Sequence, residues 1–211
     1  MKPLPRSFYL RPTVQVAKDL LGKFIVRKLK SKTLIGKIVE TEAYCEGDPA
    51  SHSYRGKTKR NDVMFWQGGH LYVYFTYGMH FCANVVTREE GIGEAVLIRA
   101  VEPMEGIDVM MRNKQRRGGA GAKGRSKTSP LRRRSPAPLL TNGPAKFCQA
   151  FGIGRKENGT DLLGDKVFIA NGERIPASKI GRSTRIGIRN GKEMKWRFFV
   201  KGSRWVSRPW R

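Results

Sequence analysis

Acidic side chains are scarce in this sequence of 211 residues. It contains 17 Asp and Glu residues against 42 Lys and Arg residues, which gives a formal net charge of +25 at pH 7. A positive excess of this size attracts polyanions, and DNA or RNA is the usual partner. The composition therefore predicts a nucleic-acid-binding protein. On charge alone, a non-catalytic ribosome-associated or chromatin protein fits as well as an enzyme.

Cysteine is also rare, since only Cys45, Cys82 and Cys148 occur in the chain. They are far apart and odd in number, and no C-x-x-C pair is present, which argues against a disulfide scaffold and against a zinc module. The three histidines match no metal-ligand spacing. We therefore expect neither a metal nor another cofactor.

Long hydrophobic runs are missing too, so the sequence predicts no membrane-spanning segment. The N-terminal residues 1–6 lack the apolar stretch of a secretory signal. These absences predict an intracellular protein, in a bacterial cytoplasm or nucleoid or in a eukaryotic nucleus. The length, and the absence of internal repeats, suit one domain spanning residues 1–211.

The hydrophobic pattern predicts a mixed α+β fold built mainly from antiparallel strand pairs. Helices are expected from Pro12 to Leu21, from Pro103 to about Met111, and from Pro144 to Phe151 with Gly152 as the stop signal. Strands are expected at residues 23–30, 33–44, 71–76, 80–86, 95–101, 166–170, 184–188 and 197–200.

A basic segment at residues 112–134 breaks this pattern. It contains ten Lys and Arg residues, no acid, and a run of glycines. Such a composition cannot bury a core, so the segment is expected to be a disordered loop. The rest of the chain keeps a large positive charge without it.

Two of the few acids lie within an apolar strand pattern, I-V-E-T-E-A-Y. Because side chains alternate across a strand, Glu40, Glu42 and Tyr44 share one face. A solvated strand face would explain a single glutamate there. A carboxylate beside aromatic rings can instead act as a general base for water. Alternation itself does not choose between the two glutamates.

The segment F-T-Y-G-M-H predicts the turn of a β-hairpin. A three-residue turn, with Gly78 at positive φ, would pair Thr76 with His80, whereas a two-residue turn would pair Thr76 with Met79. We expect the three-residue turn. Tyr77 then lies at the hairpin tip, where an exposed aromatic ring can enter a stack of bases.

The choice of turn decides which side chains share a face of the hairpin. The three-residue turn puts Asn84 on the same face as Tyr72 and Tyr74, and the two-residue turn puts it on the opposite face. Cross-strand packing would explain either tyrosine alone. Tyrosines also stack on an extruded base, with an added attraction of about 0.5–2 kcal/mol when the base is cationic. The pattern therefore predicts a base-binding pocket in which Asn84 reads a base edge.

Five basic side chains are expected to contact the phosphates of a bound nucleic acid. They are Lys23, Lys57, Lys59, Arg60 and Arg99.

Several stretches, in this order, resemble the alkyladenine (3-methyladenine, or N-methylpurine) DNA glycosylase family of the mammalian type. They are V-E-T-E-A-Y with the following A-S-H-S, L-Y-V-Y-F-T-Y-G-M-H-F-C-A-N, V-L-I-R-A-V-E-P, G-P-A-K-F-C-Q-A-F-G-I and F-F-V-K-G-S-R-W-V-S. The resemblance covers nearly the whole chain apart from residues 112–134 and a weaker stretch near 165–178. It implies a single compact α+β domain with a curved antiparallel sheet, flanking helices and a protruding hairpin that intercalates into DNA.

The resemblance also implies roles for individual residues. Glu42 falls on the general base of the family. The remaining matches are Tyr44, His52, Tyr74 and Asn84 in the pocket for the flipped base, Tyr77, Met79 and Leu97 at the intercalation site, and Arg99 near the phosphate of the flipped nucleotide.

The activity implied by the resemblance is that of a monofunctional DNA glycosylase without strand cleavage. Such an enzyme binds double-stranded DNA from the minor-groove side, acts as a monomer, and hydrolyses the N-glycosidic bond of alkylated purines. The expected substrates include 3-methyladenine and 7-methylguanine, with hypoxanthine and ethenoadenine as further candidates. The alternative is a non-catalytic nucleic-acid-binding protein that uses the same aromatic hairpin.

Overall fold

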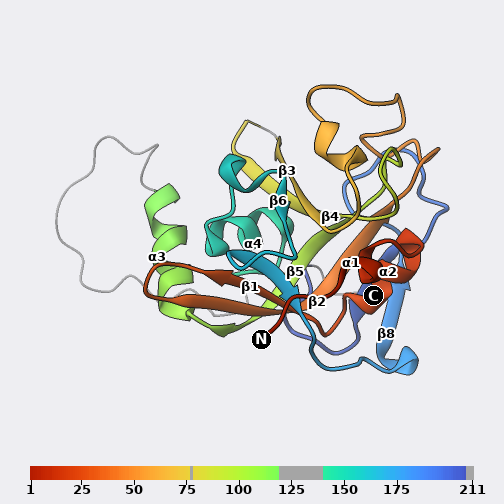
Figure 1. The fold of residues 1–211 in the computed structure, drawn as a ribbon. Helices are drawn as coiled ribbons and strands as arrows, with labels where there is room; N and C mark the ends of the chain where they lie inside the picture. The colour runs from red at the N-terminus through yellow and green to blue at the C-terminus, as the bar shows by residue number, and fades with distance from the viewer. Residues whose placement is uncertain (77, 119–139, 208–211) are drawn as a thin grey trace.

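The computed structural model describes residues 1–76, 78–118 and 140–207, which form one α+β domain (Figure 1). The strands are β1 (Phe24–Lys28), β2 (Thr33–Tyr44), β3 (His70–Thr76), β4 (His80–Val86), β5 (Ala95–Glu105), β6 (Thr160–Asp161), β7 (Val167–Ala170), β8 (Ile180–Ser183) and β9 (Arg197–Val200). The α-helices are α1 (Arg6–Tyr9), α2 (Thr13–Asp19), α3 (Ile107–Gly118) and α4 (Pro144–Phe151). Short 3-10 turns at Asp62–Phe65, Arg155–Glu157 and Ala177–Lys179 complete the described elements.

The strands form a nine-stranded sheet whose main path runs β6-β3-β4-β5-β2-β1-β7, while β9 also pairs with β2 and β8 pairs with β9. All of these pairings are antiparallel among the residues that the structure describes. The terminal strands of the path, β6 and β7, contact each other, so the sheet is nearly closed into a barrel. The mixed α+β class and the antiparallel sheet predicted from the sequence are confirmed.

Strand β2 is the centre of this arrangement, because it pairs with β1, β5 and β9. Its register against β5 shifts on both sides of Glu40, where an irregularity interrupts the ladder. Such bulges change the direction of side chains and increase the local twist. The two predicted glutamates therefore lie where β9 replaces β1 as the second neighbour of β2, which stays paired with β5.

The main hydrophobic core lies on the face of the sheet covered by α2 and α4. Helix α4 begins with Pro144 in its first turn and ends at Gly152 in the left-handed conformation, as the sequence predicted. Its rings Phe147 and Phe151 are fully buried with centroids 5.0 Å apart. A Cβ at Gly36 of β2 would lie 3.0 Å from the Phe151 ring, which explains the glycine there.

The register of the β3–β4 hairpin confirms the expected three-residue turn. Thr76 pairs with His80, and Tyr72 pairs with Asn84. Gly78 has φ +66°, as the turn requires. Tyr77, predicted at the tip, lies outside the described residues.

Three sequence-based boundaries are wrong. Pro103 does not open a helix but lies within β5, opposite Gly36 at a register irregularity, where a missing N–H is tolerated. Helix α3 begins later, at Ile107, and runs to Gly118, so residues 112–118 of the expected disordered loop are helical. Residues 119–134 of that loop lie outside the described residues. Finally, residues 184–188 form no strand, and the strand instead ends at Ser183.

Figure 1 shows α3 at the end of the domain where the β1–β2 turn lies, with α1 and α2 toward the opposite end. Within the described ranges, no helix combines the length and the apolar character that crossing a membrane requires.

Replacing Phe151 with alanine is expected to lower the free energy of unfolding by about 3–5 kcal/mol, because the change opens a cavity between α4 and β2. Urea denaturation of the purified variant measures the change. The matched control is Leu29→Ala, a truncation at a position that is 38% exposed, for which we expect a change within about 0.5 kcal/mol. Equal losses in the two variants would contradict the assignment of Phe151 to the core.

Candidate active site

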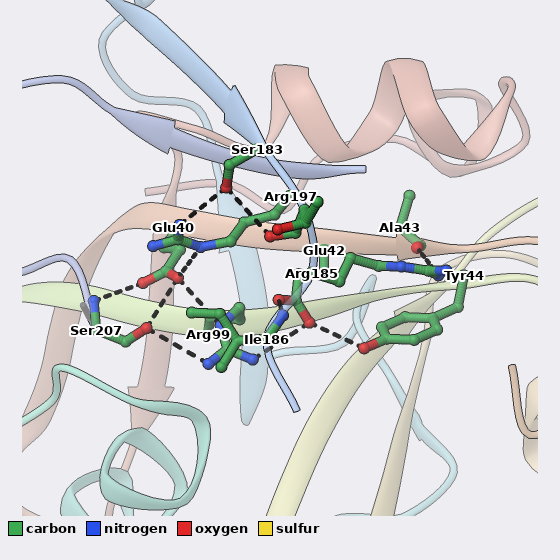
Figure 2. Close-up of polar contacts among 11 residues, drawn as sticks. Glu40, Glu42, Ala43, Tyr44, Arg99, Ser183, Arg185, Ile186, Arg197 and Ser207 are labelled. Atoms are coloured by element: carbon green, nitrogen blue, oxygen red, sulfur yellow. Dashed lines mark hydrogen bonds and ion pairs between the residues drawn. The ribbon is translucent and has the colours of Figure 1, made fainter. Parts of the chain in front are cut away.

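Glu40 and Glu42 point to the same side of β2 and are fully buried (Figure 2). Burying a carboxylate without partners costs several kcal/mol. Each of the two is therefore held by hydrogen-bond donors, and the two sets of donors differ.

Glu40 accepts four hydrogen bonds. Its Oε1 accepts from Arg99 Nε (3.0 Å), Arg197 Nε (2.7 Å) and Ser207 Oγ (2.8 Å), and its Oε2 accepts from Ser207 N (2.6 Å). Arg99 comes from β5 and Arg197 from β9, the two strands that flank β2 at this point. Each carboxylate oxygen offers about two acceptor positions, so Oε1 of Glu40 is fully occupied, while its Oε2 accepts a single bond.

Glu42 accepts three hydrogen bonds. Its Oε2 accepts from the hydroxyl of Tyr44 (2.9 Å) and from Arg99 Nη1 (3.2 Å), and its Oε1 accepts from the backbone N–H of Ile186 (2.8 Å). One acceptor position, on Oε1, is left over beside these bonds. Glu42 is thus a buried, oriented carboxylate that can still accept a proton from one more group.

Arg99 is placed differently from the expected surface contact with a phosphate. Its guanidinium lies between Glu40 and Glu42 and donates to both, and the residue is only 7% exposed. No sequence pattern indicates this role, because β5 is a nearly continuous apolar run around Arg99. The pairing of β5 with β2 is what brings the cation to the two acids.

A cavity of about 330 Å³ lies in front of this cluster, within the size range of small-molecule sites. Its walls include Tyr44, His52, Tyr72, Tyr74, Asn84, Leu97 and Arg99, together with Ile186–Ile188. The structure therefore brings together the four side chains predicted for the base pocket. Glu42 is not on the wall, but its three donor groups belong to residues that are, so its carboxylate lies directly behind the wall.

Aromatic rings form one side of the cavity. His52 Nδ1 lies 3.0 Å from the hydroxyl of Tyr72, and the His52 and Tyr74 rings meet edge to face with centroids 4.5 Å apart. The amide of Asn84 donates to the backbone carbonyl of Tyr72 at 3.1 Å, which fixes its orientation in the wall. These contacts hold the rings in place before any ligand binds.

The pKa values of Tyr44, Tyr72 and His52 in the wall are shifted in the direction that favours the neutral form of each side chain. Burial, and next the carboxylate of Glu42, raise the pKa of Tyr44, so this phenol remains a donor to Glu42. Burial raises the pKa of Tyr72 to about 12. Desolvation by the surrounding rings, and next the charge of Arg60, hold the pKa of His52 below its ordinary value although the residue is exposed at the cavity mouth.

The residues predicted for intercalation are separated in the structure. Met79 is 69% exposed at the hairpin tip, whereas Leu97 is 4% exposed and lies in the cavity wall opposite Glu42 on the neighbouring strand. Exposed Phe75 packs against Phe81 at the base of the turn, with ring centroids 5.0 Å apart. The tip therefore presents apolar side chains to solvent.

Three of the predicted phosphate contacts lie on the exposed segment between β2 and β3. The ammonium of Lys57 lies 3.0 Å from Asp62, and Arg60 donates to the carbonyl of Phe75 at 3.3 Å. Lys59 is exposed nearby. Arg60 thus ties this segment to the hairpin, on the side of the cavity formed by His52.

The sequence did not identify a buried ion pair between Asp48 and Arg185, both of whose side chains are 0% exposed. Arg185 lies in the segment wrongly predicted as a strand, and Asp48 in the loop after β2. The glycines at 187 and 191, both at positive φ, were the available signal that this segment is a loop.

Among the described residues, no group of three or more His, Cys, Asp and Glu side chains is arranged to hold a metal ion. A larger groove, of about 1060 Å³, lies between α2 and residues 171–180. Its walls contain Phe8, Lys18, Asp19, Lys23 and Arg174, but neither of the buried glutamates and none of the tyrosines found around Glu42.

Comparison with known proteins identifies the class. Residues 7–204 match the family described as Methylpurine-DNA glycosylase (MPG). The chain belongs to this family. It is therefore a DNA-3-methyladenine glycosylase, a hydrolase of N-glycosyl bonds in the base-excision repair of alkylated purines.

Relatives of similar length support this assignment. A protein of Carboxydothermus hydrogenoformans is 51% identical over 206 residues, covering 97% of this chain and 98% of its own. A protein of Methanoculleus marisnigri is 47% identical over 209 residues, with 97% and 98% coverage, and one of Francisella tularensis is 48% identical over 199 residues, with 93% and 94%. All three bear the name "Putative 3-methyladenine DNA glycosylase". They are bacterial and archaeal, so the resemblance is not specific to the mammalian type.

The depressed pKa of His52 predicts how stability depends on pH. Below about pH 6.5 the unfolded chain binds a proton at this residue that the folded state resists, so the free energy of unfolding falls as the pH drops through that value. The variant His52→Phe lacks this group. Urea denaturation at about pH 7.5 and 5.5 should show a smaller loss for the variant than for the wild type, and equal losses would contradict the assignment.

Proposed function

We propose that the 330 Å³ cavity receives a purine flipped out of double-stranded DNA and that Glu42 activates the water that cleaves its N-glycosidic bond. The observation that carries this proposal is the position of Glu42, a buried carboxylate directly behind the wall of an aromatic cavity with one acceptor position to spare. A general base needs this combination of orientation and free acceptor capacity.

The proposed chemistry is a hydrolysis without a covalent enzyme intermediate. Water attacks C1′ of the flipped nucleotide while the C1′–N bond breaks, and the bonding electrons leave with the base. Glu42 accepts the proton of the water. Arg99, shared with Glu40, stays beside Glu42 as a counter-charge. No lysine is assigned a nucleophilic role, so we expect base release without strand cleavage.

The aromatic wall favours bases that alkylation has made cationic. Tyrosine and histidine rings attract a cation through their faces, and a cationic base is also a better leaving group. Because the pKa of His52 is lowered, its imidazole is neutral near pH 7 and does not repel such a base. We infer 3-methyladenine and 7-methylguanine as substrates, with hypoxanthine and ethenoadenine as further candidates.

The hairpin tip is proposed to enter the duplex from the minor-groove side. Exposed Met79, with Tyr77 predicted beside it, would occupy the gap left by the flipped nucleotide. Lys57, Lys59 and Arg60 lie on the exposed segment that Arg60 ties to this hairpin and would contact the backbone. We propose that one intracellular chain acts alone on each lesion.

Replacing Glu42 with glutamine tests the proposed base. The amide keeps the size of the side chain but cannot take a proton from water, so single-turnover release of 3-methyladenine or 7-methylguanine from a duplex should fall by about 100-fold or more. Affinity for the same duplex should persist, because the cavity wall is unchanged.

The control for this variant is Glu90→Gln, which removes the same charge from an exposed loop and should leave release unchanged. Full release by Glu42→Gln would remove Glu42 as the base. Tight binding without release by the wild type itself would favour the non-catalytic alternative over the enzyme.

Deleting residues 119–134 tests the role of the part of the basic segment (residues 112–134) that follows helix α3. The segment carries six Lys and Arg residues, so a phosphate-binding role predicts weaker binding and a shallower dependence of log affinity on log salt, by up to about 0.9 per lost contact. Fluorescence anisotropy over a range of salt concentrations measures both. The preference among lesions should not change. An unaltered salt dependence of the affinity would rule out DNA contact by residues 119–134.

A further inference from the structure

The loop between β8 and β9 supplies one of the three groups that hold Glu42. This loop has no regular secondary structure between Thr184 and Gly191, yet the N–H of Ile186 donates to Glu42 Oε1 at 2.8 Å. Residues 186–188 also line the cavity. A loop in this position needs its own support, because a backbone donor is only as well placed as the segment that carries it.

That support comes from Arg185, the residue directly before Ile186. Its guanidinium forms a bidentate pair with Asp48, in which Nη2 lies 2.8 Å from Oδ1 and Nη1 contacts Oδ2. The same guanidinium donates to the carbonyl of Ala43 at 3.0 Å and to that of Gly191 at 3.2 Å. One side chain thus ties both ends of the loop to the end of β2.

Protein atoms enclose the Asp48–Arg185 pair on all sides. Both side chains are 0% exposed, and the guanidinium lies 4.7 Å from the centroid of the Tyr44 ring and 5.4 Å from that of Trp196. Gly191 is required here, because its φ is +69° and a Cβ would lie 2.8 Å from Arg185 Nη2 and 2.9 Å from Asp48 Oδ1. Tyr44 is itself a donor to Glu42, so the guanidinium supports two of the three groups around that carboxylate.

We propose that Asp48 and Arg185, with Gly191, are positioning residues for Glu42. They fix the Ile186 N–H against Oε1, which sets the rotation of the carboxylate and leaves its remaining acceptor position in a constant place. They touch neither the base nor the water. The inference rests on the proposed role of Glu42 as the base. It adds the Asp48–Arg185 ion pair as the interaction that orients the carboxylate of Glu42.

The variant Gly191→Ala tests this role with a small change. The added methyl must displace the Arg185–Asp48 pair, and with it the loop, so single-turnover base release should fall by about 10- to 100-fold. Affinity for the damaged duplex should change little, because the aromatic wall stays in place. The matched control is Gly91→Ala, which has the same kind of backbone, at φ +90°, but open space around its Cβ. Its release rate should equal that of the wild type.

A double-mutant cycle separates positioning from general loss of structure. In the Glu42→Gln background, Gly191→Ala should cause no further loss of release, because the carboxylate that it orients is gone. An equal proportional loss in both backgrounds would show a merely structural role and overturn the proposal. Asp48→Asn, which adds no atom, gives a second variant for the same cycle if the alanine at 191 prevents folding.

The outcomes for the two proposals differ. If Glu42→Gln stops release and both Gly191→Ala and Asp48→Asn release at the wild-type rate, only the positioning role is overturned. If Glu42→Gln releases base at full rate, the proposed base fails and the positioning role fails with it.

Discussion

The pairing of two buried carboxylates with arginines is the constraint on which this structure depends. Glu40 and Glu42 are fully buried on β2, and without donors each would cost several kcal/mol. Arg99 from β5 and Arg197 from β9 reach them only when both strands flank β2 in the observed register. These buried glutamates therefore depend on three features of the fold. They are the pairing of β2 with both β5 and β9, the register irregularity at Glu40, and the packing of the C-terminal segment through Ser207.

The pairing of Glu40 and Glu42 with arginines explains how a strongly basic protein can hold two acidic side chains inside its domain. The excess of positive charge attracts DNA at long range. Inside the domain, Arg99 and Arg197 are paired with the buried glutamates, and aromatic rings form one side of the cavity in front of Glu42. The tyrosines there stay protonated because burial raises the pKa of each, which keeps Tyr44 as a donor.

Local patterns in the sequence were enough to predict much of the fold and of the cavity. Strand alternation placed Glu40, Glu42 and Tyr44 on one face, and the glycine at the hairpin turn set the register that puts Asn84 beside the tyrosines. Both signals act over a few residues. The Arg185–Asp48 pair was missed because its members are 137 residues apart and lie in loops without periodicity. Likewise, Pro103 was wrongly predicted to begin a helix, because its pairing with Gly36 across the sheet is a long-range contact that a local sequence pattern does not show.

The geometry also addresses the one choice that alternation left open. Glu40 and Glu42 are two residues apart, share a face, and are equally buried, so burial does not separate them. Their hydrogen bonds do. Glu40 accepts four, three of them on Oε1, from Arg99, Arg197 and Ser207, and of these only Arg99 lines the cavity. Glu42 accepts three, all from groups of residues that line the cavity. The position of Glu42 directly behind the cavity wall therefore supports its proposed role as the base, whereas Glu40 holds Arg99 in place beside it.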